Sequence, residues 1–106
     1  MYVSITTLGL EQSRVSEFVA FYQRLLPFLR DVKGWQELYL LVDHEAGEGR
    51  VLAMWETGAD AYAFESSGQF RAVISQLQNV AGGPADRQVY DVVFRARPMD
   101  AGNVNA

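Results

Sequence analysis

Residues 37–56, with the sequence ELYLLVDHEAGEGRVLAMWE, decide the fold of this chain of 106 residues. Two runs rich in apolar residues, 37–43 and 50–56, predict two strands. The segment 44–49 between them contains two glycines and two glutamates, which suit an exposed hairpin loop. The stretch therefore predicts an antiparallel β-hairpin.

Both strands of this hairpin are apolar on both faces. Side chains alternate along a strand, so residues 38, 40 and 42 lie opposite residues 39 and 41, and all of them are apolar or aromatic. An antiparallel sheet with helices on one face is normally polar on the other. We therefore expect a homodimer formed through the second face of the sheet. An alternative is a helix or tail of the same chain that folds back over this face.

The residues before the hairpin predict a strand and a helix. Residues 2–10 are rich in β-branched side chains, which is typical of a strand. From residue 15 to residue 32 the apolar side chains follow helical spacing, and Ser13 precedes them as a candidate N-cap. Pro27 lies inside this helix, and Gly34 is expected to end its last turn.

The residues after the hairpin predict two short helices. Thr57 and Asp60 have the spacing of a capping box before a helix over residues 60–65. Ser66 and Gln69 repeat that spacing before a second helix. Each pattern places a side-chain oxygen where it accepts from a free backbone N–H group of the first helical turn.

The order of elements predicts the fold. Gly82-Gly83-Pro84 ends the last helix, and residues 87–97 predict the last strand. The resulting βαββαβ order is the ferredoxin-like plan, an α+β fold with a four-stranded antiparallel sheet. We expect one domain over residues 1–97 and a flexible C-terminal tail over residues 98–106.

Composition excludes several classes of function. Hydrophobic residues make up 49% of the chain and charged residues 21%, which is ordinary for a soluble globular protein. The absence of cysteine excludes disulfides and cysteine-based zinc motifs. A net charge of −4 argues against nucleic acid as a partner. No targeting segment or long apolar stretch is evident, so we expect a cytoplasmic protein without membrane contact.

Three short motifs point to a family. Gly34-Trp35 before the hairpin, Trp55-Glu56 at its end and Ser67-Gly68-Gln69-Phe70 after a short helix resemble the antibiotic biosynthesis monooxygenase superfamily over residues 1–97. The resemblance implies a dimeric α/β barrel, in which two four-stranded sheets face each other with the helices outside. The activities of this superfamily include cofactor-free oxidation of polycyclic phenols to quinones and heme degradation, and many of its members have no known activity.

The heme-degrading branch fits this chain poorly. The resemblance implies an Asn in the first strand, a Trp in the short helix and an iron-binding His in the next helix. These positions fall at Thr6, Phe64 and Ile74. Because the Ile74 side chain has no atom that ligates iron, heme degradation is not expected.

The cofactor-free branch needs aromatic walls and a group that hydrogen-bonds a phenolic oxygen. The candidates for catalysis are Tyr39, Tyr62 and Trp55. The candidates for substrate binding are Phe64, Phe70, Arg71 and Glu56. For each aromatic residue the alternative is ordinary core packing. Arg71 and Glu56 could equally be solvated or paired on the surface. Phe21 and Phe28 lie off the main apolar stripe of their helix, where they could line a pocket or form a contact patch.

A metal site is not expected. Asp43, His44, Glu45 and Glu48 lie close in sequence, but adjacent residues at a strand end point to alternating sides. His44 is also the chain's single histidine, so the cluster is interpreted as a solvated acidic turn.

The functional prediction is a cofactor-independent monooxygenase-like protein acting on an aromatic or polyketide-like molecule, with no cofactor. The alternative is a non-catalytic dimer that binds a small apolar molecule or serves as an interaction module. The sequence contains no strongly poised acid, base or nucleophile that would decide between them.

Overall fold

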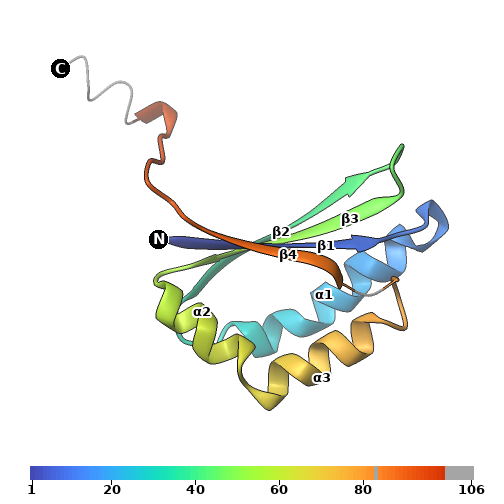
Figure 1. Cartoon of the computed structure of the whole chain (residues 1–106), viewed down its shortest axis with the longest axis horizontal. Coiled ribbons are helices and arrows are strands. Elements are labelled where there is room, and N and C mark those ends of the chain that lie inside the picture. Colours follow the sequence, from blue (N-terminus) through green and yellow to red (C-terminus); the bar gives the residue numbers. More distant parts are fainter. Residues whose placement is uncertain (83, 100–106) are drawn as a thin grey trace.

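The computed structural model describes residues 1–82 and 84–99 (Figure 1). Within these residues the chain forms an α+β fold with four strands and three α-helices. They are β1 (Tyr2–Gly9), α1 (Val15–Leu29), β2 (Trp35–Asp43), β3 (Glu48–Trp55), α2 (Gly58–Glu65), α3 (Gly68–Leu77) and β4 (Pro84–Asp91). The strand order is β2-β3-β1-β4, and all neighbouring strands are antiparallel. The ferredoxin-like prediction is confirmed.

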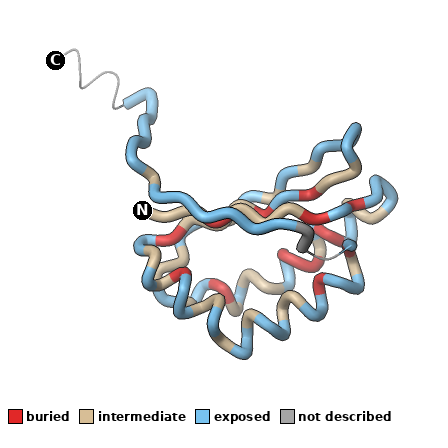
Figure 2. The backbone as a smooth tube through the Cα atoms, in the orientation of Figure 1, coloured by how far each residue is buried: buried red, intermediate tan, exposed pale blue. Residues whose placement is uncertain are grey.

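The helices cover one face of the sheet and leave the other open (Figure 1). Buried residues gather between the two layers, as Figure 2 shows. Leu8 of β1, Phe18 of α1 and Leu77 of α3 are fully buried there. These residues come from three elements distant in sequence, so a single apolar core holds the helices to the sheet.

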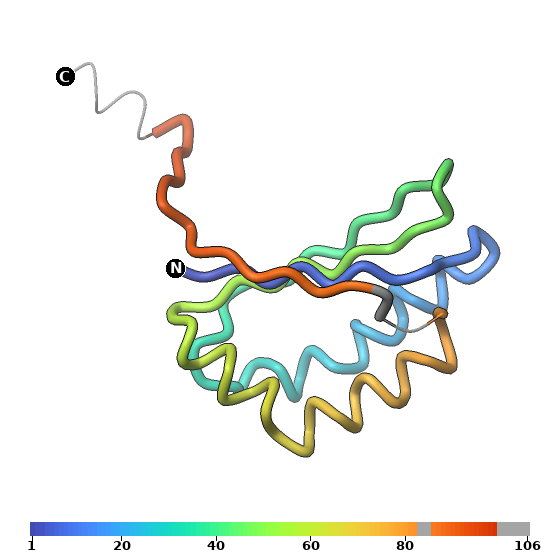
Figure 3. Tube along the Cα trace, viewed as in Figure 1, coloured from blue at the N-terminus to red at the C-terminus, as the bar shows by residue number. Residues whose placement is uncertain are grey.

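The last strand is shorter than predicted and begins earlier. Its register with β1 ends where Tyr2 pairs with Asp91, and the Val92 N–H donates to the carbonyl of Met1. Beyond Val92 the neighbouring strand has no further residue to pair with, so the prediction of a strand to Arg97 is wrong. Residues 93–99 leave the sheet beside the N-terminus and extend away from the helices (Figure 3). Of the expected tail, residues 100–106 lie outside the described residues.

Two helix caps differ from the prediction. A 3₁₀ turn over Gln12–Arg14 precedes α1, so Ser13 is not its N-cap. Helix α3 is capped by Ser67 rather than Ser66, with the Phe70 N–H donating to the Ser67 hydroxyl at 3.2 Å. The physical reason is that Ser66 still has helical dihedral angles as the C-cap of α2, whereas Ser67 is extended.

Gly34 forms the corner that joins α1 to β2, whereas α1 itself ends at Leu29, before the last turn that the sequence predicts to end at Gly34. Its φ angle is +82°, in the left-handed region that favours glycine. Its carbonyl accepts from the Glu56 N–H at 2.8 Å, which fixes the corner to the end of β3. A Cβ atom here would lie 2.3–2.5 Å from the side chain of Asp60 in α2. This close approach brings the corner against the start of α2.

Replacing Gly34 should therefore destabilise the fold. Gly34→Ala places a side chain in the left-handed region and against Asp60, and we expect it to lower the free energy of unfolding by about 2 kcal/mol or more. Urea denaturation followed by circular dichroism measures the change. The matched control is Gly68→Ala, which meets no atom within 4 Å and should leave stability equal or higher. Equal stability of Gly34→Ala and the wild type would contradict the prediction.

Candidate functional site

A small cavity of about 60 Å³ lies between the helices and the sheet. Most of its wall is apolar and comes from β2, β3, α1 and α3, with aromatic rings at the α2–α3 corner. The lining residues that carry polar groups are Ser4, Thr6, Tyr22, Trp35, Trp55 and Arg87. The cavity therefore offers an apolar interior with a few hydrogen-bonding groups, as small-molecule sites commonly do.

A β-bulge places the two tryptophans of the chain in this cavity. Trp35 is paired with Trp55, but Glu37 is paired with Met54, so Gln36 is one extra residue in β2. The extra residue shifts the alternation of side chains by one position. As a result Trp35 lines the cavity together with Leu38, although their positions differ by three, an odd number that regular alternation would place on opposite faces. The bulge thus brings a second indole to the cavity side of the sheet.

Both indole N–H groups lack a hydrogen-bond partner. The Nε1 atoms of Trp35 and Trp55 are buried, and nothing in the described part of the chain accepts from them. The Trp55 side chain is almost fully buried, with 2% of its residue surface exposed. An unsatisfied buried donor costs about 1–3 kcal/mol, so each of these two N–H groups lowers the stability of the fold.

Phe64 is the centre of an aromatic cluster at one end of the cavity. Its ring centroid lies 5.5 Å from that of Trp55, 5.5 Å from that of Phe70 and 6.3 Å from that of Phe28. Phe64 and Phe28 also line a wider surface groove of about 570 Å³ between α1 and α2. The Phe64 ring therefore stands between the small cavity and the larger outer groove.

Tyr22 contributes a hydroxyl that stays protonated. The residue is 8% exposed, and its ring packs edge-to-face against Phe18 and Phe21. Burial raises the pKa of Tyr22 well above its ordinary value of about 10, because the charged phenolate is poorly solvated there. Tyr22 can therefore donate or accept a hydrogen bond at neutral pH, but it does not act as an anionic base.

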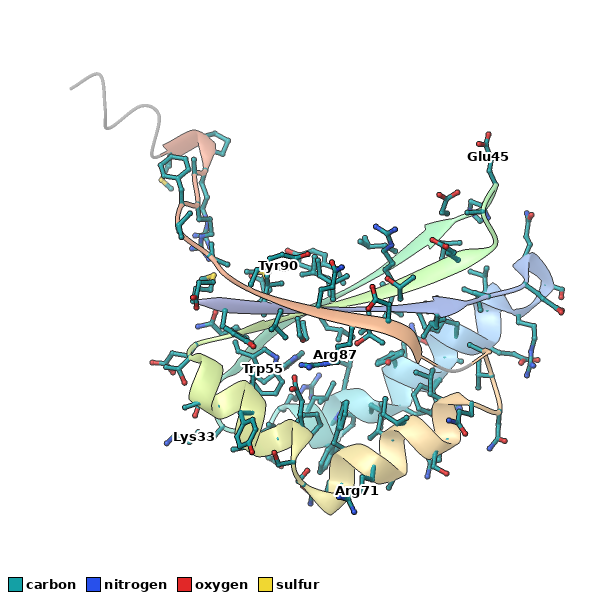
Figure 4. All side chains as sticks on the ribbon, in the orientation of Figure 1. Lys33, Glu45, Trp55, Arg71, Arg87 and Tyr90 are labelled. Carbon is teal, nitrogen blue, oxygen red and sulfur yellow. The ribbon has the colours of Figure 1, made fainter. Side chains whose placement is uncertain are left out.

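Arg87 brings a charge to the cavity, and that charge is already paired. Its guanidinium forms an ion pair with the carboxylate of Glu65 in α2. Figure 4 shows Arg87 extending from β4 toward the helix layer, near Trp55. Burial lowers the pKa of Arg87, although a guanidinium remains charged at any physiological pH. The pair ties β4 to α2, and the described residues of the cavity wall carry no unpaired charge.

The structure brings together three of the seven predicted site residues. Trp55, Phe64 and Phe70 all line the cavity. Phe28 joins this cluster through its contact with Phe64, whereas Phe21 is 4% exposed and belongs to the core. Phe21 and Phe28, which the sequence left undecided, therefore have different roles.

The other four predicted site residues lie elsewhere. Tyr39 is on the outer face of the sheet, because it follows Leu38 by one position and alternation separates them. Its hydroxyl donates to Glu37 at 2.7 Å, and this bond together with the carboxylate charge raises the pKa of Tyr39. The remaining three, all exposed, are Glu56, Tyr62 and Arg71.

Sequence reasoning missed four polar residues of the cavity: Ser4, Tyr22, Trp35 and Arg87. Tyr22 follows the helical spacing of the apolar side chains over residues 15–32 and packs in the core, but this spacing does not reveal a cavity. The Gly34-Trp35 motif was noted, yet nothing in the sequence marks the bulge at Gln36 that directs Trp35 inward. Period-two alternation in β1 is the signal that could have located Ser4.

The three positions that the resemblance assigns to the heme-degrading branch also meet here. Thr6, Phe64 and Ile74 all line the cavity, although they come from β1, α2 and α3. Their side chains do not provide an iron ligand. Over residues 1–82 and 84–99 no group of three or more His, Cys, Asp or Glu residues is arranged to hold a metal ion. In the same ranges no helix has the length and apolarity required to cross a membrane.

Comparisons with known proteins show the fold. No family model matches the sequence, and no curated protein matches it either. Among solved structures, a putative antibiotic biosynthesis monooxygenase from Bordetella bronchiseptica is 18% identical and has a TM-score of 0.73, over 88% of this chain and 97% of that one. SnoaB, a cofactor-independent oxygenase from Streptomyces nogalater, is 12% identical with a TM-score of 0.71, over 92% and 96% of the two chains.

A third structure, a putative antibiotic biosynthesis monooxygenase from Deinococcus radiodurans, is 13% identical with a TM-score of 0.72 over 93% of this chain and 99% of that one. Identities this low establish a shared fold and nothing finer. The chain has the ferredoxin-like fold of the antibiotic biosynthesis monooxygenases. The resemblance inferred from its sequence motifs is thus confirmed at the level of the fold.

The buried phenol of Tyr22 should make the protein sensitive to alkali. The folded state keeps Tyr22 protonated at a pH where the unfolded chain ionises it, so this contribution to stability is complete below about pH 10 and is lost as the pH rises further. Tyr22→Phe should therefore flatten the decline in stability above about pH 10. Urea unfolding at a series of pH values measures this slope, with exposed Tyr62→Phe as the control. Parallel slopes for Tyr22→Phe and the wild type would contradict the prediction.

Proposed function

We propose that this protein is a cofactor-independent monooxygenase that oxidises a small, electron-rich phenol or a related aromatic compound. The observation that carries the proposal is the cavity between helices and sheet, which combines the aromatic walls of Trp55, Phe64 and Phe70 with the hydroxyl-bearing side chains of Ser4, Thr6 and Tyr22. The presence of the same fold in SnoaB, a cofactor-independent oxygenase, supports it.

The proposed reaction requires few groups from the protein. A phenol and O₂ give a para-quinone and water: one oxygen atom becomes the new ring carbonyl, and the other leaves as water with the phenolic proton and the displaced ring proton. The phenol itself supplies the four electrons that reduce O₂. The protein's part is to hold the ring against aromatic walls, to bond its oxygen and to exclude bulk water.

The lining residues also limit which phenols react. No carboxylate or imidazole lines the cavity within the described residues, and Tyr22 stays protonated. The phenol must therefore lose its proton to solvent before the ring is enclosed. Compounds whose own phenolic pKa is low are the favoured substrates in this proposal, and turnover should rise with pH until that pKa is passed.

The cavity is too small for a complete aromatic ring, so the proposal requires Phe64 to move. A cavity of roughly 150 Å³ is needed to enclose benzene, whereas the cavity here is about 60 Å³. It accommodates the oxygen-bearing end of a ligand but not a complete ring. Rotation of Phe64 would join it to the outer groove of about 570 Å³ that the same ring lines. In this proposal the aromatic body of the substrate enters through that groove.

Oxygen consumption tests the proposed activity. We expect the wild type to consume O₂ with electron-rich phenols that carry hydrogen at the para position, and Phe64→Ala to increase turnover of polycyclic hydroxyanthrones several-fold relative to monocyclic compounds. An oxygen electrode measures uptake, and isotope-labelled O₂ shows whether one atom enters the product. Tyr62→Ala, on an exposed residue of α2, is the control. Uptake no faster than the blank for both the wild type and Phe64→Ala, across the whole panel, would contradict the proposal.

We further propose that two copies of the chain associate through the outer face of the sheet. Two rows of paired residues cross all four strands on this face: Tyr39, Leu52, Ile5 and Gln88, and Glu37, Met54, Val3 and Tyr90. Their centres are apolar, and Tyr39 and Tyr90 at the edges are about half exposed. A contiguous apolar patch of this kind normally marks an interface.

The C-terminal segment also favours the outer face of the sheet as the dimer interface. Val93 is 93% exposed and Phe94 is 82% exposed, on a segment that extends away from the helices (Figure 3). A second copy seated on the outer face would give these side chains an apolar partner. The two sheets would then lie face to face, with the helices of each copy outside, which is the barrel that the resemblance implies.

A charge at the centre of the outer face should separate the dimer. Leu52→Glu would require a carboxylate to be buried between the sheets, so we expect a monomer at micromolar concentration with the circular dichroism of a folded chain. Size-exclusion chromatography with light scattering measures the mass. Tyr62→Glu, on the helical side, should remain dimeric. A monomeric wild type at the same concentration would contradict the proposal.

A second candidate function is a non-catalytic binding module. The observation that favours it is the absence of a proton acceptor from the described lining of the cavity. In that case aromatic compounds bind to the protein, detected by calorimetry, but no O₂ is consumed at any pH. Binding without turnover therefore distinguishes this function from the monooxygenase.

A further inference from the structure

The two edge strands of the sheet differ in their chemistry. Among the described residues β2 pairs with β3 alone, and residues 36–42 make no backbone hydrogen bond outside that pairing. The opposite edge strand, β4, has charged residues at positions 86, 87 and 91, and such charges normally protect an edge from pairing with another chain. In β2 residues 38–42 are all apolar or aromatic. An open edge of this composition is usually covered by another segment.

An apolar groove lies beside the open edge. Its volume is about 220 Å³, and its lining comes from α1 and β2, including Val19, Leu26 and Leu40. Trp35 and Leu38 line both this groove and the cavity of the candidate site. A segment placed along β2 would therefore cover the groove and close one side of the cavity.

The C-terminal segment, residues 92–97, has the composition of a strand but leaves its own sheet. The Val92 N–H donates to the carbonyl of Met1, and β1 begins at Tyr2, so the sheet of the same copy has no further residue to pair with this segment. Val93 and Phe94, whose side chains favour strands, are almost entirely exposed. The segment extends away from the helices (Figure 3). It therefore presents unpaired backbone and apolar side chains to a second molecule.

We propose that residues 92–97 of one copy pair, as an added strand, with the open edge of β2 in a second copy. Alternation assigns the side chains: Tyr90 is on the outer face, so Phe94, four positions later, lies between the two sheets. Val93 then lies on the helix side, against the groove. The segment of one copy becomes part of the wall around the site of the other. The inference rests on the proposed dimer and adds to it the segment that the two copies exchange.

The charges of the two segments are complementary. Strand β2 contains the acidic residues Glu37 and Asp43 and no basic residue. The segment 92–97 contains the basic residues Arg95 and Arg97 and no acidic residue. Pairing of the two strands therefore brings opposite charges to neighbouring strands, which is favourable. By alternation both arginines share the side of Val93, where their long side chains reach solvent past the groove.

Contacts between copies, observed by NMR, test the exchange directly. In a mixture of ¹³C-labelled and unlabelled full-length protein, an isotope-filtered experiment detects only contacts between different copies. We expect contacts from Val93 of one copy to the methyl groups of Leu26 and Leu40 of the other. We also expect contacts from the Phe94 ring to Tyr39 on the outer face of the same β2 strand.

Amide hydrogen exchange provides a second measurement. The β2 N–H groups that point away from β3 should be protected in the wild-type dimer and exchange about tenfold faster or more in the Leu52→Glu monomer. The double variant Val93→Asn/Phe94→Asn should show the same loss and raise the dissociation constant of the dimer about tenfold or more, because it removes apolar burial. Met99→Asn, at a residue that is 77% exposed and lies beyond the segment, is the matched control and should change neither value. Circular dichroism verifies that each variant is folded.

Three results would overturn the inference while leaving the proposed dimer intact. The first is a dimeric wild type whose β2 N–H groups exchange as rapidly as those of Leu52→Glu, and the second is an unchanged dissociation constant for Val93→Asn/Phe94→Asn. The third is a set of contacts between copies that joins the outer faces but never residues 92–97 to β2. A monomeric wild type overturns both the dimer and the exchange. The proposed oxidation is measured separately, since its failure appears as an absence of O₂ consumption.

Discussion

The antiparallel sheet imposes a rule of alternation on which most of this structure depends. Successive side chains point to opposite faces, so each strand position belongs either to the helix side or to the outer side. The helices cover one side only. Leu38 is consequently at the cavity, whereas Tyr39, its neighbour in sequence, has half of its surface in solvent. The same rule separates the surface proposed for catalysis from the surface proposed for dimerisation, and it places them back to back across a single sheet.

One irregularity modifies the rule. The extra residue at Gln36 shifts β2 by one position, and Trp35 joins Trp55 on the cavity side. Bulges are common beside functional sites because they redirect one side chain without disturbing the rest of the sheet. Here the redirected side chain carries a buried donor without a partner. The unsatisfied donor lowers the stability of the fold at this place.

The proposed activity depends on the cavity and on the aromatic cluster around Phe64. Phe64 contacts Trp55, Phe70 and Phe28, and it also faces the outer groove. It stands at a position that the resemblance assigns to a functional Trp, but it provides no polar atom. The polar groups of the cavity come instead from the sheet and α1. The fold is thus shared with a cofactor-independent oxygenase, while the chemistry available in the cavity is set by the residues that line it.

The sequence by itself determined the order of elements and the division of the hairpin side chains into two apolar faces, because these follow from local periodicity. It also identified Trp55, Phe64 and Phe70, which the structure brings to one cavity. Only the tertiary structure decided that Trp35, Tyr22 and Arg87 belong there too. The bulge in β2, the burial of the Tyr22 phenol and the ion pair between β4 and α2 all depend on which distant segments meet. Local sequence patterns do not contain that information. For the same reason the last strand ends at Asp91: its length is set by where β1 begins, not by its own residues.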